Sequence, residues 1–210
     1  SLTRRSLAQA ALALCAVGAA GAAQAQAWPS SKPIRVVVGF APGGSTDVMA
    51  RIVSLSLSES LGQAVVIDNK PGASGNIAAA EVIRANPDGY TFLIAPTSVE
   101  TANPSLFKSS ILPSRDLAPV GGVGKTQMYL VGKQQLEAKD ARELVALAKA
   151  QPGKLSYAAA GAGTPPHLAC ELFKLSTGTF ITHIPYRGAA PALQDVMAGQ
   201  TDFVCDPGIA

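Results

Sequence analysis

The chain has 210 residues, of which 48% are apolar, 15% charged and 5% aromatic, with 17 Lys and Arg against 14 Asp and Glu. This composition excludes intrinsic disorder, which requires low hydrophobicity and high charge. Three cysteines are too few to hold a small fold by disulfides alone. A formal charge of +3 is too slight to indicate a nucleic-acid partner. The length allows one large domain or two small ones.

The first 27 residues have the composition of a secretory signal peptide. Arg4 and Arg5 precede an uncharged run, 7–23, made almost entirely of Ala, Leu, Val and Gly, and Ala25-Gln26-Ala27 forms a small-residue cleavage pattern. We expect cleavage after Ala27 and a periplasmic mature chain, with export by either the Sec or the twin-arginine route. The alternative is a membrane anchor, for which the run is short. Cleavage would lower the formal charge to +1.

From Ile34 onward, short β-branched runs alternate with patterns of helical period. In chain order, the pattern predicts strands at 34–40, 64–67, 91–95, 155–159, 181–186 and 202–205, with further extended segments at 120–123 and 128–131. It predicts helices that begin at a Thr46 cap and end at Gly62, then at 76–85, after an Asp140 cap, at 165–176 and at 191–198. Repeated β-α-β units imply parallel sheets with helices on both faces. Because 103–119 is irregular, we predict an α/β protein with two lobes.

Three loops at predicted strand ends are rich in small residues: 41–47, 71–76 and 160–167. Ligands of open α/β sheets bind at the carboxyl ends of the strands. Glycine lets a backbone approach a ligand closely, and a helix N-terminus offers free N–H groups with a favourable dipole. The first and third loops each lead into a helix, so we interpret them as a shared anion site rather than as plain tight turns. We expect the carboxylate of Asp47 to accept hydrogen bonds from backbone N–H groups and hold the first loop.

The common enzyme templates do not fit the sequence. A phosphate-binding loop ending at Gly124-Lys125-Thr126 would need glycine where Pro119 stands, and a dinucleotide fingerprint starting at Gly161 would need glycine where Pro166 stands. The two histidines, His167 and His183, lack metal-ligand spacing. We expect His167 to hydrogen bond to its own loop. The sequence therefore predicts no catalytic set, no metal and no cofactor.

A series of motifs follows Ala27 in order: Trp28–Arg35, Phe40–Asp47, Asp68–Asn76, Asn86–Thr91, Asn103–Phe107, Ala148–Leu155, Tyr157–Leu168, His183–Gly188 and Gly199–Asp202. Together they resemble the Bug family, the periplasmic substrate-binding receptors of tripartite tricarboxylate transporters. The resemblance covers essentially the whole chain after the signal peptide.

The resemblance implies a monomeric two-lobe receptor that closes on a small carboxylate held by backbone amides and water, and delivers it to the integral membrane subunits of the transporter. It implies no cofactor and no nucleic-acid partner. The ligand-binding residues it implies are Gly44, Ser45, Thr46 and Asp47 in the first lobe, Gly161, Gly163, Thr164 and His167 in the second, and also Ser98 and Asp206.

The resemblance also sets expected domain bounds: a signal peptide at 1–27, a first lobe at 28–122, a second lobe at 123–206 and a crossover back to the first lobe from 207 to 210. The family chain continues beyond this point, so we expect a fragment truncated at the C-terminus, with poor stability and weak binding. Two features depart from the family pattern: Pro165-Pro166 stiffens the third loop, and Pro207 follows Asp206.

Two other functions fit parts of the sequence. The same pocket could serve a receptor that signals to a membrane sensor. A secreted hydrolase could use Ser74 or Cys170 as its nucleophile, although neither histidine can be assigned as its base. Cys170 and Cys205 could also pair in an oxidising compartment, and the residue types do not identify which carboxylate is bound.

Overall fold

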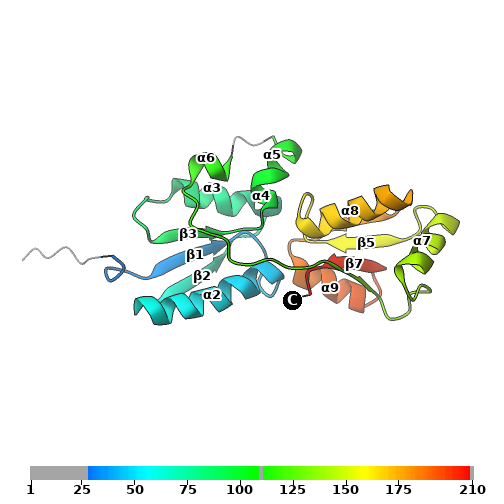
Figure 1. Ribbon diagram of the computed structural model, residues 1–210, viewed down its shortest axis with the longest axis horizontal. Coiled ribbons are helices and arrows are strands. Elements are labelled where there is room, and N and C mark those ends of the chain that lie inside the picture. Colours follow the sequence, from blue (N-terminus) through cyan, green and yellow to red (C-terminus); the bar gives the residue numbers. More distant parts are fainter. Residues whose placement is uncertain (1–27, 109–110, 209–210) are drawn as a thin grey trace, which may run out of the picture.

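The computed structural model describes residues 28–108 and 111–208. The predicted signal peptide and the last two residues of the predicted crossover lie outside the described residues. Within the described part, no helix is both long enough and apolar enough to cross a membrane. Two sheets lie side by side, and each carries helices on both faces (Figure 1).

The first sheet has the order β2-β1-β3 and is entirely parallel. Its strands are β1 (Ile34–Val38), β2 (Val65–Asn69) and β3 (Thr91–Ile94), and helices α2 (Ser45–Leu61) and α3 (Asn76–Arg84) cover its two faces. A short 3₁₀ turn, η1 (Ala73–Gly75), leads into α3. We call this sheet with its helices the first lobe.

Strand β1 is buried because it lies at the centre of that sheet. Val36 and Val38 pack with Ala50 of α2, whereas Val37 packs with Ala78 and Val82 of α3. Successive side chains of a strand point to opposite faces, so a run of valines supplies apolar contacts to both layers. This explains the continuous apolar run in the sequence.

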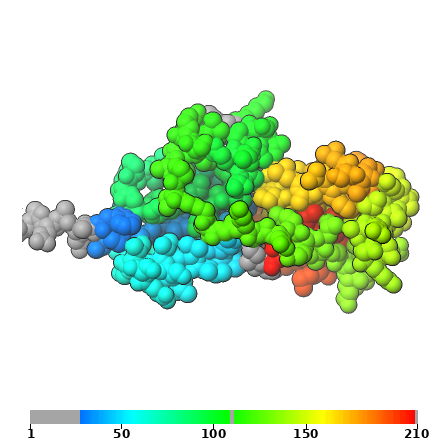
Figure 2. Space-filling model, viewed as in Figure 1, coloured from blue at the N-terminus to red at the C-terminus, as the bar shows by residue number. Residues whose placement is uncertain are grey.

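The chain between the two sheets is mostly irregular. It contains three single-turn helices, α4 (Ser98–Thr101), α5 (Asn103–Leu106) and α6 (Pro113–Asp116), and then runs without regular structure to β4 (Tyr129–Gly132). Residues 120–123, predicted as an extended segment, form no strand. Three of the residues from 121 to 124 are glycines, which gain little from strand formation. Figure 2 shows this segment crossing the front of the molecule from one lobe to the other.

The second sheet has the order β4-β7-β5-β6. Strands β5 (Ser156–Ala159), β6 (Thr182–Pro185) and β7 (Phe203–Asp206) are parallel, whereas β4 pairs with β7 in the antiparallel sense. Helices α7 (Ala141–Ala150) and α8 (Pro165–Thr177) cover one face and α9 (Ala189–Met197) covers the other. We call this sheet with its helices the second lobe.

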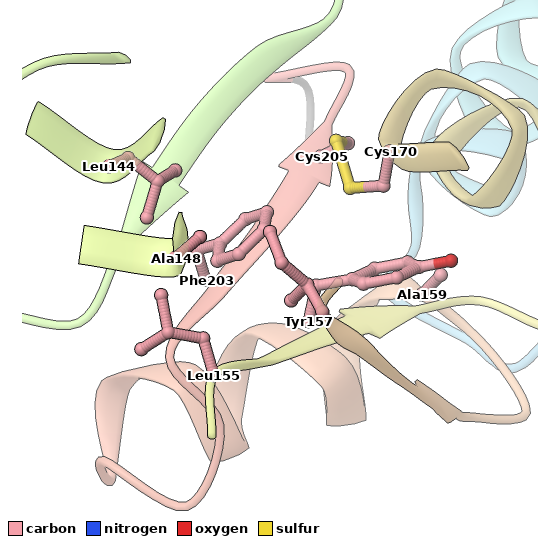
Figure 3. Packing of buried hydrophobic residues seen from close by; sticks show 9 residues of the cluster. Leu144, Ala148, Leu155, Tyr157, Ala159, Cys170, Phe203 and Cys205 are labelled. Atoms are coloured by element: carbon pink, nitrogen blue, oxygen red, sulfur yellow. A yellow bond between two sulfur atoms is a disulfide. The ribbon is translucent and has the colours of Figure 1, made fainter. Parts of the chain in front are cut away.

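The core of the second lobe is larger than that of the first. Tyr157 and Phe203 stack with ring centroids 6.0 Å apart, and Leu144 and Ala148 of α7 pack against them (Figure 3). Cys170 of α8 and Cys205 of β7 form a disulfide in the same cluster. The pairing that the sequence left open is thus made.

The predicted β–α alternation is confirmed, with shifts at the ends of elements. The prediction that Thr46 caps α2 is wrong, because the N-cap is Gly44 and Thr46 lies inside the first turn. The Asp140 cap of α7 is confirmed: its carboxylate accepts hydrogen bonds from the N–H groups of Arg142 and Glu143. The expected domain bounds stay a prediction.

Candidate ligand-binding site

A cleft of about 580 Å³ lies between the two lobes. Its walls come from the carboxyl ends of β1, β3 and β5, from the starts of α2, α8 and α9, and from the segment that joins the lobes. This volume falls within the range of small-molecule sites. The residues lining it are Phe40, Gly44, Ser45, Thr46, Met49, Leu93, Ile94, Ala95, Pro96, Thr97, Gly121, Gly122, Val123, Gly124, Lys125, Thr126, Met128, Ala160, Thr164, Pro165, Pro166, Ala189 and Pro207.

The start of α2 presents main-chain donors to this cleft. Gly44, Ser45 and Thr46 line it, and Ser45 and Thr46 are the first two residues of the helix. Because N–H groups in a first helical turn have no partner within the helix, those of Ser45 and Thr46 are available to a ligand. The helix dipole adds partial positive charge at the same place.

Asp47 does not line the cleft but supports the loop that does. Its carboxylate is buried and accepts hydrogen bonds from the N–H of Gly43 at 2.9 Å, Asn69 Nδ2 at 2.9 Å and Arg51 Nε at 2.9 Å. Burial opposes the ionised form, but hydrogen bonds from Arg51, Gly43 and Asn69 outweigh it and lower the pKa of Asp47. The expected role of Asp47 as holder of the loop is confirmed.

The start of α9 meets the start of α2. A Cβ built on Gly44, the N-cap of α2, would lie 3.4 Å from the main-chain nitrogen of Ala189, the first residue of α9. The N–H of Ala41 donates to the carbonyl oxygen of Arg187 at 3.3 Å, which ties the two loops together. In Figure 1 the bluer, N-terminal end of α2 faces the second lobe beside α9. Sequence reasoning missed Ala189, although Gly188 ends one of the motifs quoted above.

The start of α8 is built differently. Thr164 is buried and lines the cleft, and Pro165 and Pro166 follow it as the first two residues of the helix. Gly161 and Gly163 are absent from the lining, and both carry positive φ angles that suit glycine, 108° and 79°. These two glycines shape the loop that places Thr164 and the prolines.

His167 lies behind this loop rather than in the cleft. Its Nδ1 accepts a hydrogen bond from the N–H of Gly163 at 3.1 Å, as expected for a histidine that holds its own loop. Burial lowers the pKa of His167, which keeps the ring neutral and Nδ1 able to accept. The ring of His183 lies 4.4 Å from that of His167, centroid to centroid.

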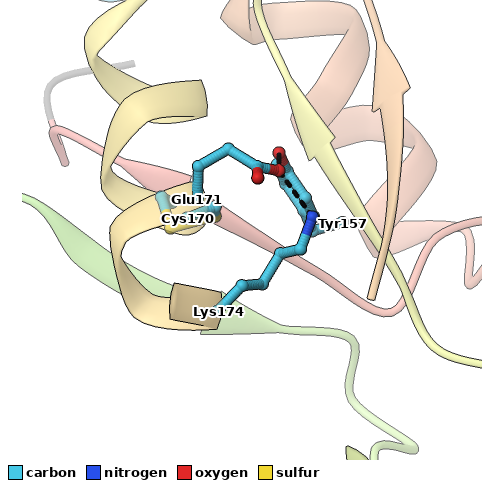
Figure 4. The surroundings of a disulfide bond; sticks show 5 residues. Tyr157, Cys170, Glu171 and Lys174 are labelled. Atoms are coloured by element: carbon cyan, nitrogen blue, oxygen red, sulfur yellow. Dashed lines mark hydrogen bonds and ion pairs between the residues drawn. A yellow bond between two sulfur atoms is a disulfide. The ribbon is translucent and has the colours of Figure 1, made fainter. Parts of the chain in front are cut away.

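A group of polar side chains surrounds the two histidines on the α8 face of the second sheet. Tyr157 Oη donates to Glu171 Oε1 at 2.5 Å, and Lys174 Nζ donates to the same oxygen at 2.6 Å (Figure 4). His183 stacks on Tyr157, and its pKa falls to about 4, mainly through burial and then through the nearby His167. Its Nε2 is buried without a hydrogen-bond partner among the described residues. These residues support the second lobe and lie outside the cleft lining.

Ser98 and Asp206 are buried next to the cleft. Their neighbours Thr97 and Pro207 line it. Within the described part of the chain, Ser98 Oγ and Asp206 Oδ2 have no hydrogen-bond partner, whereas Asp206 Oδ1 accepts from the N–H of Gly208 at 2.7 Å. Of the ten residues predicted for the site, Gly44, Ser45, Thr46 and Thr164 line the cleft, and the others stand one layer behind or beside it.

The joining segment contributes lining that sequence reasoning did not assign. Residues 121–126 line the cleft and include Lys125, whose side chain is on an exposed stretch. The cluster of glycines after Pro119 was the available signal, because glycine lets a chain pass close over a pocket. In the sequence, this stretch had been considered only as a possible phosphate-binding loop.

The two nucleophiles considered for a hydrolase have other partners. The sulfur of Cys170 is in a disulfide with Cys205. The hydroxyl of Ser74 donates to the carbonyl oxygen of Ala162 at 2.6 Å, a contact between the first lobe and the α8 loop. Nucleophilic catalysis requires a free thiolate or a hydroxyl directed to a base. Neither residue is placed for that role.

A protein-family comparison matches residues 49–207 to the model described as "Tripartite tricarboxylate transporter family receptor". This match covers well over half of the chain. The chain belongs to this receptor family. The curated protein BugT of Bordetella pertussis is similar to it, with 38% identity over 192 residues that cover 89% of this chain and 57% of BugT.

Solved structures of similar proteins agree in fold. R. palustris Rpa4515 with adipate is 36% identical with a TM-score of 0.83, and MatC from Rhodopseudomonas palustris with bound malate is 31% identical with a TM-score of 0.76. The match to Rpa4515 covers 86% of this chain and 60% of Rpa4515, and the match to MatC covers 84% of this chain and 60% of MatC. The chain therefore has the α/β architecture of the periplasmic binding proteins, and it spans less than two thirds of these relatives.

Proposed function

We propose that this chain is part of a periplasmic receptor that binds a small carboxylate in the cleft and delivers it to the integral membrane subunits of a tripartite tricarboxylate transporter. The observation that carries the proposal is the meeting of α2 and α9 at the cleft, where Gly44 stands against Ala189. Two helix starts place two partial positive charges close together, which is unfavourable unless an anion lies between them.

Three further facts support a carboxylate as that anion. The family is one of receptors, and the relatives matched in structure hold adipate and malate. Main-chain N–H groups at a helix start bind carboxylate without a charged side chain. The expected signal peptide at 1–27 is consistent with a periplasmic receptor.

The residues proposed to bind the ligand directly are Gly44, Ser45, Thr46 and Thr164, to which the structure adds Ala189. Asp47, Gly161, Gly163 and His167 are proposed to hold the loops that carry them. Ser98 and Asp206 remain proposed contacts, because each has an unpartnered oxygen beside the cleft.

The sharpest test removes one main-chain donor and leaves the helix intact. Ser45 is the first residue of α2, a position where proline is well tolerated, and the preceding Gly44 already has the extended conformation that a following proline requires. We expect Ser45→Pro to weaken carboxylate binding about tenfold, as the loss of one hydrogen bond to a charged group does. Ser45→Ala, which keeps the N–H and removes only the hydroxyl, is the matched control.

Calorimetric titration with a panel of small carboxylates measures both variants, and mass spectrometry of co-purified small molecules identifies the natural ligand. Recovery of only phosphate, sugar or metal would contradict the carboxylate proposal. Equal losses in Ser45→Pro and Ser45→Ala would show that the hydroxyl, and not the N–H, makes the contact. Co-purification with the membrane subunits tests the delivery step.

A further inference from the structure

The two lobes offer the cleft unequal numbers of hydrogen-bond donors. In the first lobe, Ser45 and Thr46 each bring a main-chain N–H to the wall. The second lobe brings that of Ala189, at the start of α9 and beside the start of α2. In α8 the two corresponding helix positions are Pro165 and Pro166, which have no N–H. A helix start is therefore present at the second wall without the donors that normally make it an anion site.

Three further donors of the α8 loop are used within the second lobe. The N–H of Gly161 donates to Ala159 O at 2.9 Å, that of Gly163 to His167 Nδ1 at 3.1 Å, and the hydroxyl of Thr164 to Gly161 O at 2.8 Å. The next N–H along the helix belongs to His167, which does not line the cleft. At the surface of Pro165 and Pro166 a carboxylate would lose its water without gaining hydrogen bonds from the helix start.

Apolar side chains make up most of the other lining. Met49, Val123, Met128 and Pro207 line the same cleft as the two prolines. Lys125 is the cation in the described lining, and its segment is exposed. An exposed ion pair contributes little, because water and salt screen it. The cleft thus combines one wall of main-chain donors with one wall of apolar surface.

We infer, on the basis of the proposed function, that this chain binds a monocarboxylate with an apolar body in preference to a dicarboxylate. The carboxylate lies against the starts of α2 and α9, and the hydrocarbon part packs on Pro165 and Pro166. The two prolines act as specificity-determining residues, since they give shape to the wall and withhold the donors that a second carboxylate needs.

Two matched pairs of acids test this inference by calorimetric titration: hexanoate against adipate, and octanoate against suberate. The members of a pair differ only by a second carboxylate in place of a terminal methyl. We expect the monoacid to bind at least tenfold more tightly in each pair. A diacid that binds as tightly as its monoacid, or more tightly, would overturn the inference and leave the proposed function standing. Failure of all four acids to bind would count against the proposed function itself.

The Pro165→Ala/Pro166→Ala variant assigns the preference to the two prolines, because it restores two N–H groups at the helix start. We expect adipate to gain about tenfold in affinity while hexanoate changes less than threefold. Pro191→Ala, at the third position of α9 and outside the cleft lining, is the control and should leave the ratio unchanged. If the double variant does not fold, as judged by circular dichroism, Pro165→Ala alone is used, since Pro165 is only half-buried.

The Lys125→Met variant tests whether the cation in the cleft lining affects the preference between monoacid and diacid. An ion pair with Lys125 would favour the diacid, so if it formed, Lys125→Met would weaken adipate binding more than hexanoate binding. A loss of more than threefold for adipate alone would show that the cleft does hold a second carboxylate, and would overturn the assignment to the prolines. We expect a change of less than threefold for both acids.

Discussion

Helices α2 and α8 both begin at the cleft after a glycine-rich loop, yet α2 opens with Ser45 and Thr46 and α8 with Pro165 and Pro166. Both helices begin after an N-cap residue in the extended conformation, and both direct the positive end of the helix dipole towards the cleft. They differ in donors, because proline supplies the required φ angle but no N–H. A glycine-rich turn into a helix therefore lets the backbone approach a cleft, whereas the residues of the first turn decide whether an anion is bound there.

The two lobes also differ in what stabilises them. The first lobe holds its loop with buried Asp47, and the second holds α8 with a disulfide and the Tyr157, His183 and Phe203 stack. Three changes probe that difference, and the single tryptophan, Trp28, reports on the first lobe. Hydrogen exchange of β5 and β7 reports on the second.

Removal of the disulfide should have the largest effect. Cys170 and Cys205 are 35 residues apart in the sequence. Removal of a disulfide that closes a loop of this size lowers the free energy of unfolding by about 3 to 4 kcal/mol. We expect Cys170→Ala/Cys205→Ala to lower the protection of β5 and β7 by that amount, with little change at Trp28. The variant should unfold identically with and without reductant. Equal losses in both lobes would show that they unfold as one unit.

Asp47→Asn should affect the opposite lobe. The amide keeps the shape but lacks the second acceptor oxygen and the charge, so the hydrogen bonds from Gly43 and Asn69 are weakened in a buried place. We expect a loss of about 2 kcal/mol in urea unfolding followed by Trp28 fluorescence. Carboxylate affinity should fall as well, because Gly43 precedes the donor-bearing turn. Asp88→Asn, at an exposed ion pair with Lys32, is the control. An unchanged midpoint in Asp47→Asn would show that the loop holds its shape without this carboxylate.

Mild acid should weaken the second lobe by a smaller amount. The folded-state pKa of His183 is about 4, below the ordinary value of 6.5, so the unfolded chain binds more protons between these values. Stability from this group is complete above pH 6.5 and decreases as pH falls towards 4. We expect a loss on the order of 1 to 2 kcal/mol across this window, measured by urea unfolding at a series of pH values.

His183→Phe keeps the ring stack on Tyr157 and should flatten this pH dependence. Both histidines of the chain lie in the second lobe, so Trp28 should show no matching decrease in the same window. A pH slope that survives in His183→Phe would show that other groups of the second lobe cause it, such as His167, whose pKa is also lowered by burial.

Local patterns in the sequence predicted many of the strands, helices and turns. The valine run of β1, the Asn86-Pro87-Asp88-Gly89 turn and the Asp140 cap each have a local physical cause, so their elements were predictable. The Thr46 cap was wrong because the buried Asp47 fixes the loop through Asn69, a partner 22 residues away. The segment at 120–123, predicted to be extended, forms no strand, because the glycines around Val123 gain little from strand formation.

The site was predictable in outline and not in detail. The loop after β1 was found because Gly-Gly-Ser-Thr has a direct chemical meaning at a helix start. Ala189 was missed because an alanine side chain carries no chemical signal, and its place beside the start of α2 depends on the packing of α9. His167 could be placed behind the loop because a histidine in a first helical turn lies within reach of its own loop.

By itself, the sequence determined the α/β alternation, the loops that approach a ligand and the family to which the chain belongs, since each depends on residues close together along the chain. Three features depend on the folded chain: α9 meets α2, Cys170 pairs with Cys205, and two prolines form one wall of the cleft. These are contacts between distant segments, and their geometry follows from how two sheets and their helices pack together. That packing determines which main-chain N–H groups line the cleft, and therefore which ligands the cleft can bind.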